Sequence, residues 1–306
     1  STMDHLVRFE TFIREAFIHR QHVLAVFFDL EKAYDTTWKH GILSDMHAMG
    51  FRGRLPTFIQ EFLSDRSFKV RVGSTHSDPF VQEMGVPQGS ILSPVLFSIK
   101  INNIVKAVTA GTDASLFVDD FALCVRGATL HRVERHLQLC VNKVQQWVSE
   151  NGFKFSPSKT TCVHFTRQRG CFSDPNICIN GTPVAVAKEA KFLGVIFDQK
   201  LSFISHIKYV RTSCQKSLDV LRVVGHTSWG ADRTVLLRLY RALVRSKLDY
   251  ACIVWGSARK SYLQMLDPIH HQGLRICLGA FRTSPVQSLY VEAGEPSLTT
   301  RRKRLS

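Results

Sequence analysis

Three aspartates stand where hydrophobic runs end, and they constrain the fold of this chain more than any other feature. Asp29 follows the run HVLAVFF, which is rich in Val and Phe and predicts a buried strand. Asp119 and Asp120 lie between two short hydrophobic runs, 116–118 and 121–125, which predict a hairpin with the acids at its tip. Adjacent carboxylates repel each other, and a carboxylate at the end of a buried strand is costly unless it is paired or metal-bound. The three acids therefore predict a divalent-cation site, in which two hard cations about 4 Å apart would serve phosphoryl transfer.

The pattern around these acids predicts an α+β fold. Helical spacing of hydrophobic residues is found over 5–20, 37–49, 58–63, 90–105 and 133–148, whereas 68–72, 153–155, 161–165 and 191–197 have the character of strands. From about residue 201 onward the pattern is mainly helical. The sequence thus predicts two domains, residues 1–200 with a sheet backed by helices and residues 201–306 built mainly of helices.

The charge is distributed unevenly along the chain. Its 306 residues carry a formal net charge of +15, of which residues 1–160 contribute +2 and residues 161–306 contribute +13. A basic half of this kind indicates a polyanionic partner, with a basic surface that serves only solubility as the alternative. No hydrophobic run reaches the roughly 20 residues of a bilayer span, so we expect no membrane partner. Eight scattered cysteines without a C-x-x-C pair predict reduced thiols in an intracellular protein, cytoplasmic or nuclear.

One predicted helix, 233–248, carries an arginine stripe. Arg238, Arg241 and Arg245 lie within about 60° of each other at 100° per residue. A different face of this helix is hydrophobic and consists of Leu236, Leu239, Tyr240 and Leu243. The stripe has two interpretations, a face that contacts phosphates or an ordinary solvated exterior. The basic run RRKR at 301–304 is similarly either a nuclear signal or a solvated tail.

Five segments, in order and with matching spacing, resemble the motifs of reverse transcriptases. They are VFFDLEKAYDTTWKH (26–40), GVPQGSILSP (85–94), LFVDDF (116–121), NGFKFSPSKTTCVHF (151–165) and KFLGVIF (191–197). The sequence, including LDYACIVWGSA and the final RRKRL, is similar to the reverse transcriptases of the jockey-like group of non-LTR retrotransposons. The resemblance covers residues 1–200 closely and residues 201–306 more loosely. It implies the palm of a right-hand polymerase, an antiparallel sheet backed by helices, followed by a mainly helical basic thumb.

The resemblance implies an RNA-directed DNA polymerase that adds dNTPs to a DNA primer on an RNA template. Asp29, Asp119 and Asp120 would hold two Mg²⁺ ions, for which Mn²⁺ is a possible substitute. One ion would activate the primer 3′-hydroxyl and the other would hold the triphosphate. The backbone carbonyl of Leu30 would contribute to the second ion. Lys159 would lie near the triphosphate and donate a proton to the leaving group.

Further residues acquire roles only through the resemblance. Tyr34 stands where the family has an aromatic side chain that excludes a ribose 2′-hydroxyl, which favours deoxynucleotides. Gln88 and Gly89 would lie near the incoming nucleotide. The turn Phe192–Leu193–Gly194 would grip the primer, and the three arginines of the stripe would hold the template–primer duplex.

The chain also departs from the family pattern. Val118 stands where alanine is more common, and we expect it to be tolerated. The start, STMDHLVRFE, resembles a segment that follows the fingers strands, so we expect an N-terminally truncated piece of a larger polyprotein. A nucleic-acid-binding remnant without catalytic activity is therefore the alternative function. A telomerase-like or intron-encoded enzyme would share the acids but would need an RNA-binding or maturase-type extension. His131, His136 and Cys140 do not have zinc-site spacing and predict an ordinary helix surface.

Overall fold

The computed structural model describes residues 1–226 and 228–305 and divides into two compact units. The sheet unit consists of Ile13–Ala190, and the helical unit consists of Ser1–Phe12 together with Lys191–Ser306. Helix α1 (Thr2–Ile18) contributes to both units. The predicted division fell at residue 200, whereas these compact units divide between 190 and 191.

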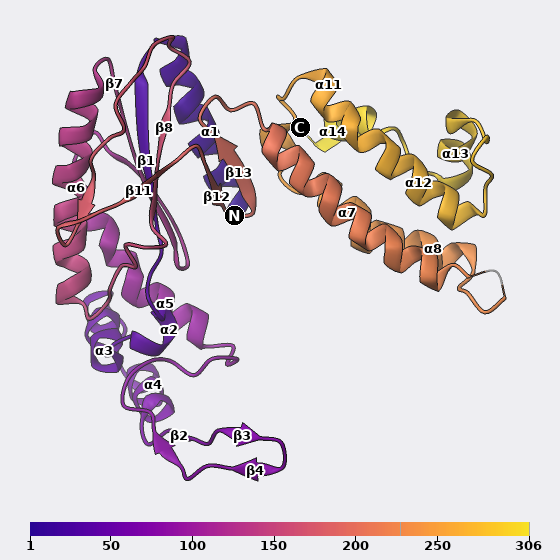
Figure 1. Ribbon diagram of the computed structural model, residues 1–306. Helices are drawn as coiled ribbons and strands as arrows, with labels where there is room; N and C mark the ends of the chain where they lie inside the picture. The colour runs from indigo at the N-terminus through magenta and orange to yellow at the C-terminus, as the bar shows by residue number, and fades with distance from the viewer. Residues whose placement is uncertain (227, 306) are drawn as a thin grey trace. The chain divides into compact units, whose positions relative to one another are not determined.

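A five-stranded sheet forms the centre of the sheet unit, in the order β11-β8-β1-β7-β6 (Figure 1). The strands are β1 (His22–Phe28), β6 (Asp113–Phe117), β7 (Asp120–Gly127), β8 (Thr161–Phe165) and β11 (Ala185–Ala187). All pairs are antiparallel except β11 with β8. Every residue of β1 is buried, which is why its sequence is a continuous hydrophobic run with no alternation. The predicted buried strand and the predicted hairpin around the paired acids are both present.

Helix α6 (Leu130–Glu150) packs against β1 and β7 and supplies much of the core beneath the sheet. Its buried side chains include Val133, Leu137, Val141, Val144 and Val148, which are the five that the sequence places on one face. They meet Leu24, Val26 and Phe28 of β1 in one hydrophobic cluster. The short pair β9 (Cys178–Ile179) and β10 (Thr182–Pro183) lies beside this helix, where the Gln138 amide donates to the Cys178 carbonyl.

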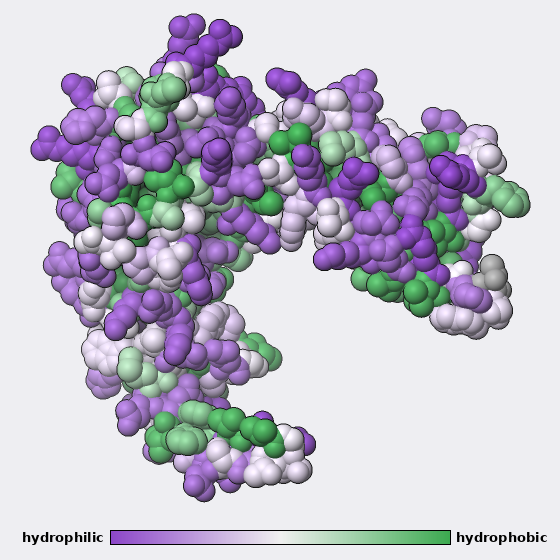
Figure 2. Space-filling view, in the orientation of Figure 1, coloured by the Kyte–Doolittle hydropathy of each residue, from purple (hydrophilic) through white to green (hydrophobic). Residues whose placement is uncertain are grey.

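Short helices follow the end of β1. They are α2 (Ala33–Thr36), α3 (Lys39–Ala48), α4 (Arg54–Leu63) and α5 (Ser93–Ile101), which continues into the 3-10 helix η1 (Asn102–Ala107). A second core joins α3, α4 and α5 through Ile42, Met46, Ile59, Leu63 and Leu96. Between α4 and α5 the chain forms a two-stranded ribbon of β2 (Ser67–Phe68), β3 (Arg71–Val72), β4 (Thr75–His76) and β5 (Phe80–Val81). Figure 2 shows hydrophobic side chains along this ribbon, where Phe68, Val72 and Phe80 are exposed.

The helical unit begins with the hairpin of β12 (Glu189–Phe192) and β13 (Val195–Asp198). Phe9 of α1 packs against this hairpin, with ring centroids 5.6 Å from Phe192 and 4.9 Å from Phe197. These contacts explain why the first twelve residues join the helical unit. The remaining elements are α7 (Ile204–Val224), α8 (Arg233–Tyr240), η2 (Arg241–Arg245), α9 (Ser246–Asp249), α10 (Cys252–Trp255), α11 (Lys260–Leu263), η3 (Gln264–Leu266), α12 (Asp267–Leu278), α13 (Val286–Ala293) and α14 (Leu298–Leu305).

Three local predictions are wrong in this structure. The strand expected over 68–72 is divided into β2 and β3, which belong to separate pairs. The helix expected over 233–248 is interrupted by a π-helical turn, η2, which shifts the buried face by one residue. Val244 is therefore fully buried, whereas Leu243, expected on the hydrophobic face, is 36% exposed. The strand expected over 153–155 is reduced to a single bridge between Phe155 and Leu30. The α+β class itself is confirmed, with an antiparallel palm-like sheet backed by helices and a mainly helical C-terminal part.

Candidate active site

Asp29 and Asp120 come together because β1 and β7 are antiparallel neighbours. The last pair of the register is Phe28 with Phe121, so the next pair outward along the strands is Asp29 with Asp120. Asp29 is partly buried, with its side chain 41% exposed, where the chain leaves the core. Two acids, one directly after β1 and one at the start of β7, thus lie next to each other at the same end of two neighbouring inner strands.

Asp119 lies in the tight turn that joins β6 to β7. The turn is closed by the pair Phe117 and Asp120, which leaves only Val118 and Asp119 between them. Val118 has φ 56°, in the left-handed region, which is strained for a β-branched residue. The turn holds both acids at its exposed tip, as the sequence predicts. Val118, which the sequence predicts to be tolerated, therefore stands at a strained backbone position.

The Asp120 carboxyl lies within electrostatic reach of the other two acids. Burial raises the pKa of the Asp120 carboxyl, and the charges of Asp119 and then Asp29 raise it further. Mutual repulsion of this kind is what a bound cation would relieve.

The chemistry of the acids fits divalent cations, because clustered carboxylate oxygens are the hard donors that Mg²⁺ and Mn²⁺ prefer. Within residues 1–226 and 228–305, no group of three or more His, Cys, Asp or Glu side chains is arranged to hold a metal ion as it stands. The Asp29 carboxylate instead pairs with the Lys159 ammonium. Leu30, whose carbonyl is the fourth candidate donor, is buried and held by its bridge to Phe155.

Lys159 reaches Asp29 because the segment 154–160 runs beside the end of β1. The Glu31 amide donates to the Lys154 carbonyl over 2.9 Å, and the Ser156 amide donates to the Asp29 carbonyl over 2.8 Å. The Asp29 amide in turn donates to the Thr160 hydroxyl over 3.3 Å. The Lys159 ammonium then lies 3.5 Å from the Asp29 carboxylate. The Lys159 ammonium and the three carboxylates therefore lie at the same end of β1 and β7.

Tyr34 is held beneath the turn that contains the Pro-Gln-Gly motif. The Val86 amide donates to the Tyr34 carbonyl over 2.8 Å, and the Gly85 amide donates to the Thr37 carbonyl over 2.8 Å. The Tyr34 ring stacks on Phe97, with centroids 4.9 Å apart and an interplanar angle of 22°. Burial and then the charge of Asp119 raise the pKa of the Tyr34 hydroxyl. The aromatic ring thus lies within electrostatic reach of the paired acids.

Gly85 permits this contact for a steric reason. Its φ is +85°, and a Cβ there would come within 2.6 Å of the Asp35 carbonyl oxygen and 2.8 Å of the Tyr34 carbonyl oxygen. Gly89 also has a positive φ, +87°, but a Cβ there would meet nothing within 4 Å. The Gln88 amide donates to the Asp35 carboxylate over 2.8 Å, which gives Asp35 a role in positioning this turn.

A buried lysine near the same segment gave no signal in the sequence. Lys100 is 3% exposed and pairs with Asp45 at 3.1 Å, while it donates to the Asn151 amide oxygen over 2.7 Å. Its ammonium also lies 5.6 Å from the centre of the Trp38 ring. This network ties α3 and α5 to the end of α6. Only contacts between residues about 50 apart in sequence reveal it.

The predicted primer-gripping turn belongs to the helical unit, whereas the acids belong to the sheet unit. Phe192 is buried against Phe9, while Leu193 and Gly194 have φ of 44° and 82° in the turn between β12 and β13. The Tyr250 hydroxyl donates to the Leu193 carbonyl over 2.7 Å and anchors the turn to the helices.

The arginine stripe is divided by the fold. Arg238 is exposed. Arg241 and Arg245 both donate to the carboxylate of Glu295 over 2.7 Å, and Glu295 is only 2% exposed. The expected solvated or phosphate-binding face is thus partly an ion-pair network, in which Arg245 also lies 3.8 Å from Asp249. Arg238 is exposed, whereas Arg241 and Arg245 are only 40% and 25% exposed.

Of the three residues of α6, His131 is exposed, His136 lies 3.1 Å from the Thr112 hydroxyl, and Cys140 is fully buried and not on the helix surface as expected. None of the eight cysteines, all of which lie in the described part of the chain, forms a disulfide.

Comparison with known proteins agrees with the geometry. The chain is 28% identical over 287 residues to "Probable RNA-directed DNA polymerase from transposon BS" of Drosophila melanogaster, an alignment that covers 90% of this chain and 31% of that protein. It is 27% identical over 292 residues to "RNA-directed DNA polymerase from mobile element jockey" of the same organism, covering 91% and 31%. This chain therefore spans about a third of the length of these relatives.

A solved structure of apo telomerase from Candida tropicalis aligns with 99% of this chain and 53% of its own, at 11% identity and a TM-score of 0.46. The match to a family is more specific, because it covers residues 1–197, which contain all five motifs. The chain belongs to the reverse transcriptase (RNA-dependent DNA polymerase) family.

Proposed function

We propose that this chain is the polymerase core of a non-LTR retrotransposon and that it extends a DNA primer on an RNA template. The observation that carries the proposal is the placement of Asp29 opposite Asp120, with Asp119 beside them and Lys159 at 3.5 Å. Three acids and one lysine at the end of two inner strands are suited to phosphoryl transfer. In that reaction, positioning and electrostatic stabilisation supply most of the rate enhancement. Two Mg²⁺ ions, or Mn²⁺ in their place, would supply Lewis-acid activation of the attacking and leaving oxygens.

The residues of the chain have separate tasks in this proposal. Asp29, Asp119 and Asp120 would hold the ions, with the Leu30 carbonyl as a further donor. The Lys159 ammonium, next to Asp29, would stabilise charge on the triphosphate and donate a proton to the leaving group.

Selection of the dNTP sugar would depend on Tyr34, whose ring is fixed by its stacking on Phe97 and by the turn above it. Gln88 and Gly89 belong to that turn and would contact the nucleotide.

The helical unit would hold the template and primer. The net charge of +12 on its residues 191–306, the turn at Phe192–Gly194 and the exposed Arg238 support this role. No described helix is long and apolar enough to cross a membrane. We also propose an intracellular location, cytoplasmic or nuclear, because the substrate is nucleic acid.

Primer extension tests the proposal. The full chain is incubated with Mg²⁺, dNTPs and a DNA primer annealed to RNA, beside Asp119→Ala and the control Asp78→Asn, an exposed loop acid. We expect extension by the wild-type and control proteins and a loss of about 10³-fold or more in Asp119→Ala. Undiminished synthesis by Asp119→Ala would refute the role of that acid. Salt-sensitive binding of the duplex without extension would instead favour a non-catalytic nucleic-acid-binding remnant.

A further inference from the structure

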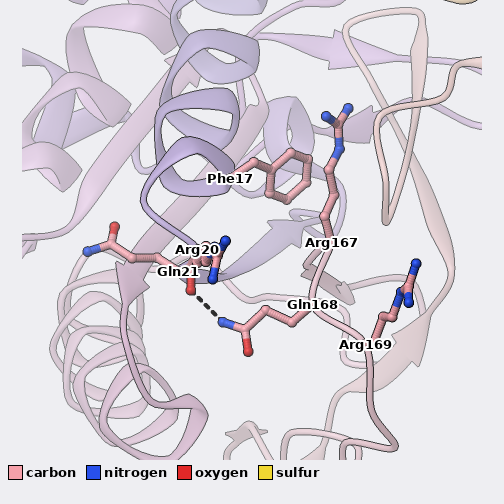
Figure 3. A pocket seen from close by; sticks show the side chains of 6 residues that line it. All are labelled: Phe17, Arg20, Gln21, Arg167, Gln168 and Arg169. Carbon is pink, nitrogen blue, oxygen red and sulfur yellow. Dashed lines mark hydrogen bonds between the residues drawn. The ribbon is translucent and has the colours of Figure 1, made fainter.

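A second basic site lies at the end of the sheet opposite the acids. A cavity of about 680 Å³ is lined by Phe17, Arg20, Gln21, Arg167, Gln168 and Arg169 (Figure 3). All six belong to the sheet unit and come from two segments, the end of α1 with the residues after it and the segment that follows β8. The cavity thus joins residues about 150 apart in sequence.

This cavity and the three acids lie at opposite ends of β1. Gln21 directly precedes β1, and Val23 pairs with Phe165, the last residue of β8. Asp29 directly follows the other end of β1. At about 3.3 Å per residue, the strand places the two sites about 23 Å apart along its axis. The cavity is therefore not part of the active site.

The lining of the cavity is specific in its chemistry. It contains three guanidinium groups, two amide side chains and one aromatic ring, but no carboxylate. The Arg167 guanidinium lies over the Phe17 ring, 4.8 Å from its centre, so this cation is oriented by the end of α1. The Gln168 amide donates to the Arg20 carbonyl and ties the two segments together, as Figure 3 shows. Arg20 has φ 52°, which turns the chain sharply between α1 and β1.

A cavity whose lining includes three guanidinium groups and no carboxylate suits an anion with several acceptor oxygens. Guanidinium forks match phosphate oxygens with two parallel hydrogen bonds, and arginine is the side chain preferred for this purpose. Successive phosphates of one strand would satisfy several guanidinium groups at once, whereas a carboxylate side chain carries a single charge on a separate flexible stem. The cavity is large enough for a phosphate with part of its nucleotide.

We propose that this arginine pocket binds the phosphodiester backbone of a single-stranded nucleic acid, as a second contact distinct from the template–primer site. Arg20 and Arg169 contact phosphate oxygens, Arg167 is held in place by Phe17, and the amides of Gln21 and Gln168 donate further hydrogen bonds. The inference goes beyond the proposed function, because binding here requires none of the catalytic residues.

The test compares charge-matched variants of the full chain. The pocket variant is Arg20→Gln/Arg169→Gln, which leaves Arg167 and its stacking in place. The control variant is Arg132→Gln/Arg135→Gln, which removes the same charge from the exposed surface of α6. Circular dichroism and thermal melting establish that each variant is folded. Binding of a short, fluorescently labelled, unstructured RNA is followed by anisotropy at a series of KCl concentrations.

We expect the pocket variant to bind the RNA about 10-fold more weakly than the control variant, because two charge-assisted contacts are lost. The slope of log K against log salt should fall in magnitude by about 1.4, which corresponds to two phosphate contacts on a single strand. The same loss should appear in an Asp119→Asn background, which separates this result from any failure of catalysis. Equal affinities and slopes for the pocket and control variants would overturn the proposal.

Two competitors identify the ligand. In the first competition, poly-glutamate and unlabelled RNA are compared at equal concentrations of negative charge. Equal displacement of the labelled RNA would show that the pocket does not select phosphates and would overturn the assignment. In the second, inorganic phosphate would have to raise the melting temperature of the control variant but not of the pocket variant, while both variants bind the RNA equally. That result would assign a small phosphate ligand to the pocket and would refute binding of a nucleic-acid strand. RNA competition alone, sensitive to the pocket variant, supports the proposal.

Discussion

The Lys159 ammonium lies 3.5 Å from the Asp29 carboxylate, although 130 residues separate them in sequence. The contact depends on backbone bonds between segment 154–160 and the end of β1 and not on the side chains alone. A cation held there can stabilise the charge that develops on a triphosphate.

Replacing Lys159 tests its role as a proton donor. We expect Lys159→Gln to slow primer extension about 10²-fold at saturating dNTP, because a general acid typically contributes this much. Lys159→Arg keeps the charge but raises the pKa of the donor, so its rate should rise more steeply toward high pH. Lys154→Gln is the control, since Lys154 is exposed and contributes only its carbonyl. A Lys159→Gln enzyme with wild-type single-turnover rates would contradict the prediction.

Two glycines with similar backbone angles should respond differently to alanine. Both Gly85→Ala and Gly89→Ala impose a positive φ on alanine, which costs about 1 kcal/mol. Only Gly85→Ala adds a collision with the carbonyls of Tyr34 and Asp35. We expect it to reduce kcat/KM for dNTP about 10²-fold by displacing the turn. Steady-state kinetics of the two variants check this, and equal losses would show that the turn does not need the close approach.

Tyr34 should control the choice of sugar. Tyr34→Ala removes the ring stacked on Phe97, and we expect the preference for dNTP over rNTP to fall about 10- to 100-fold, as for the loss of one steric contact. Tyr34→Phe keeps the ring and should keep the preference. Competing extension with dNTP and rNTP measures both. Unchanged discrimination in Tyr34→Ala would assign sugar selection to another residue.

Glu295 should be essential to the helical unit. Glu295→Gln removes the buried carboxylate that Arg241 and Arg245 share, although both arginines keep some contact with solvent. We expect a loss of about 2 kcal/mol in the unfolding free energy, as for hydrogen bonds to charged groups. The matched control is Glu292→Gln, because Glu292 is 63% exposed and pairs with Arg233 at the surface. That change should cost less than about 0.5 kcal/mol. Denaturant unfolding followed by the fluorescence of Trp255, which is fully buried in this unit, provides the measurement.

Acid should destabilise the sheet unit through a pair of buried histidines. His22 Nδ1 and His164 Nε2 lie 2.9 Å apart, and burial followed by the charge of His22 lowers the pKa of His164 to about 4. Burial also lowers the pKa of His22. Between pH of about 6.5 and 4 the unfolded chain therefore binds protons that the folded chain does not, and stability falls as the pH falls.

The size of this effect is up to about 1.4 kcal/mol per pH unit for each histidine. His164→Gln should flatten the dependence, whereas His131→Gln, on the exposed surface of α6, should leave it unchanged. Urea unfolding at pH values across this window gives the slope. Parallel curves for wild type and His164→Gln would show that the pair does not titrate with unfolding.

The sequence predicted those parts of the site that local pattern encodes. A continuous hydrophobic run that ends at Asp29 specifies a central strand, and two runs around Asp119 and Asp120 specify a hairpin. Once these strands pair, the three acids meet at the same end of β1 and β7. The hydrophobic face of α6 was equally visible, because its periodicity is regular over about four turns.

The remaining features depend on contacts that no local pattern records. The carboxylate that engages Arg241 and Arg245 is 50 residues away, and the partner of Lys100 is 55 residues away. The π-helical turn at Arg241–Arg245 breaks a hydrophobic periodicity that looks uninterrupted in the sequence. The arginine pocket likewise joins the end of α1 to residues that follow β8.

The packing of Phe9 on Phe192 and Phe197 has a consequence for synthesis of the chain on the ribosome. Residues 1–12 emerge before residues 13–190, but their partners in the helical unit begin only at Lys191. At about 5–20 residues per second, the first turns of α1 wait roughly 10–40 s for that partner. The sheet unit can close in the meantime, because its own segments run from Ile13 to Ala190. A segment that is made before the whole sheet unit is thus among the last to find its final contacts.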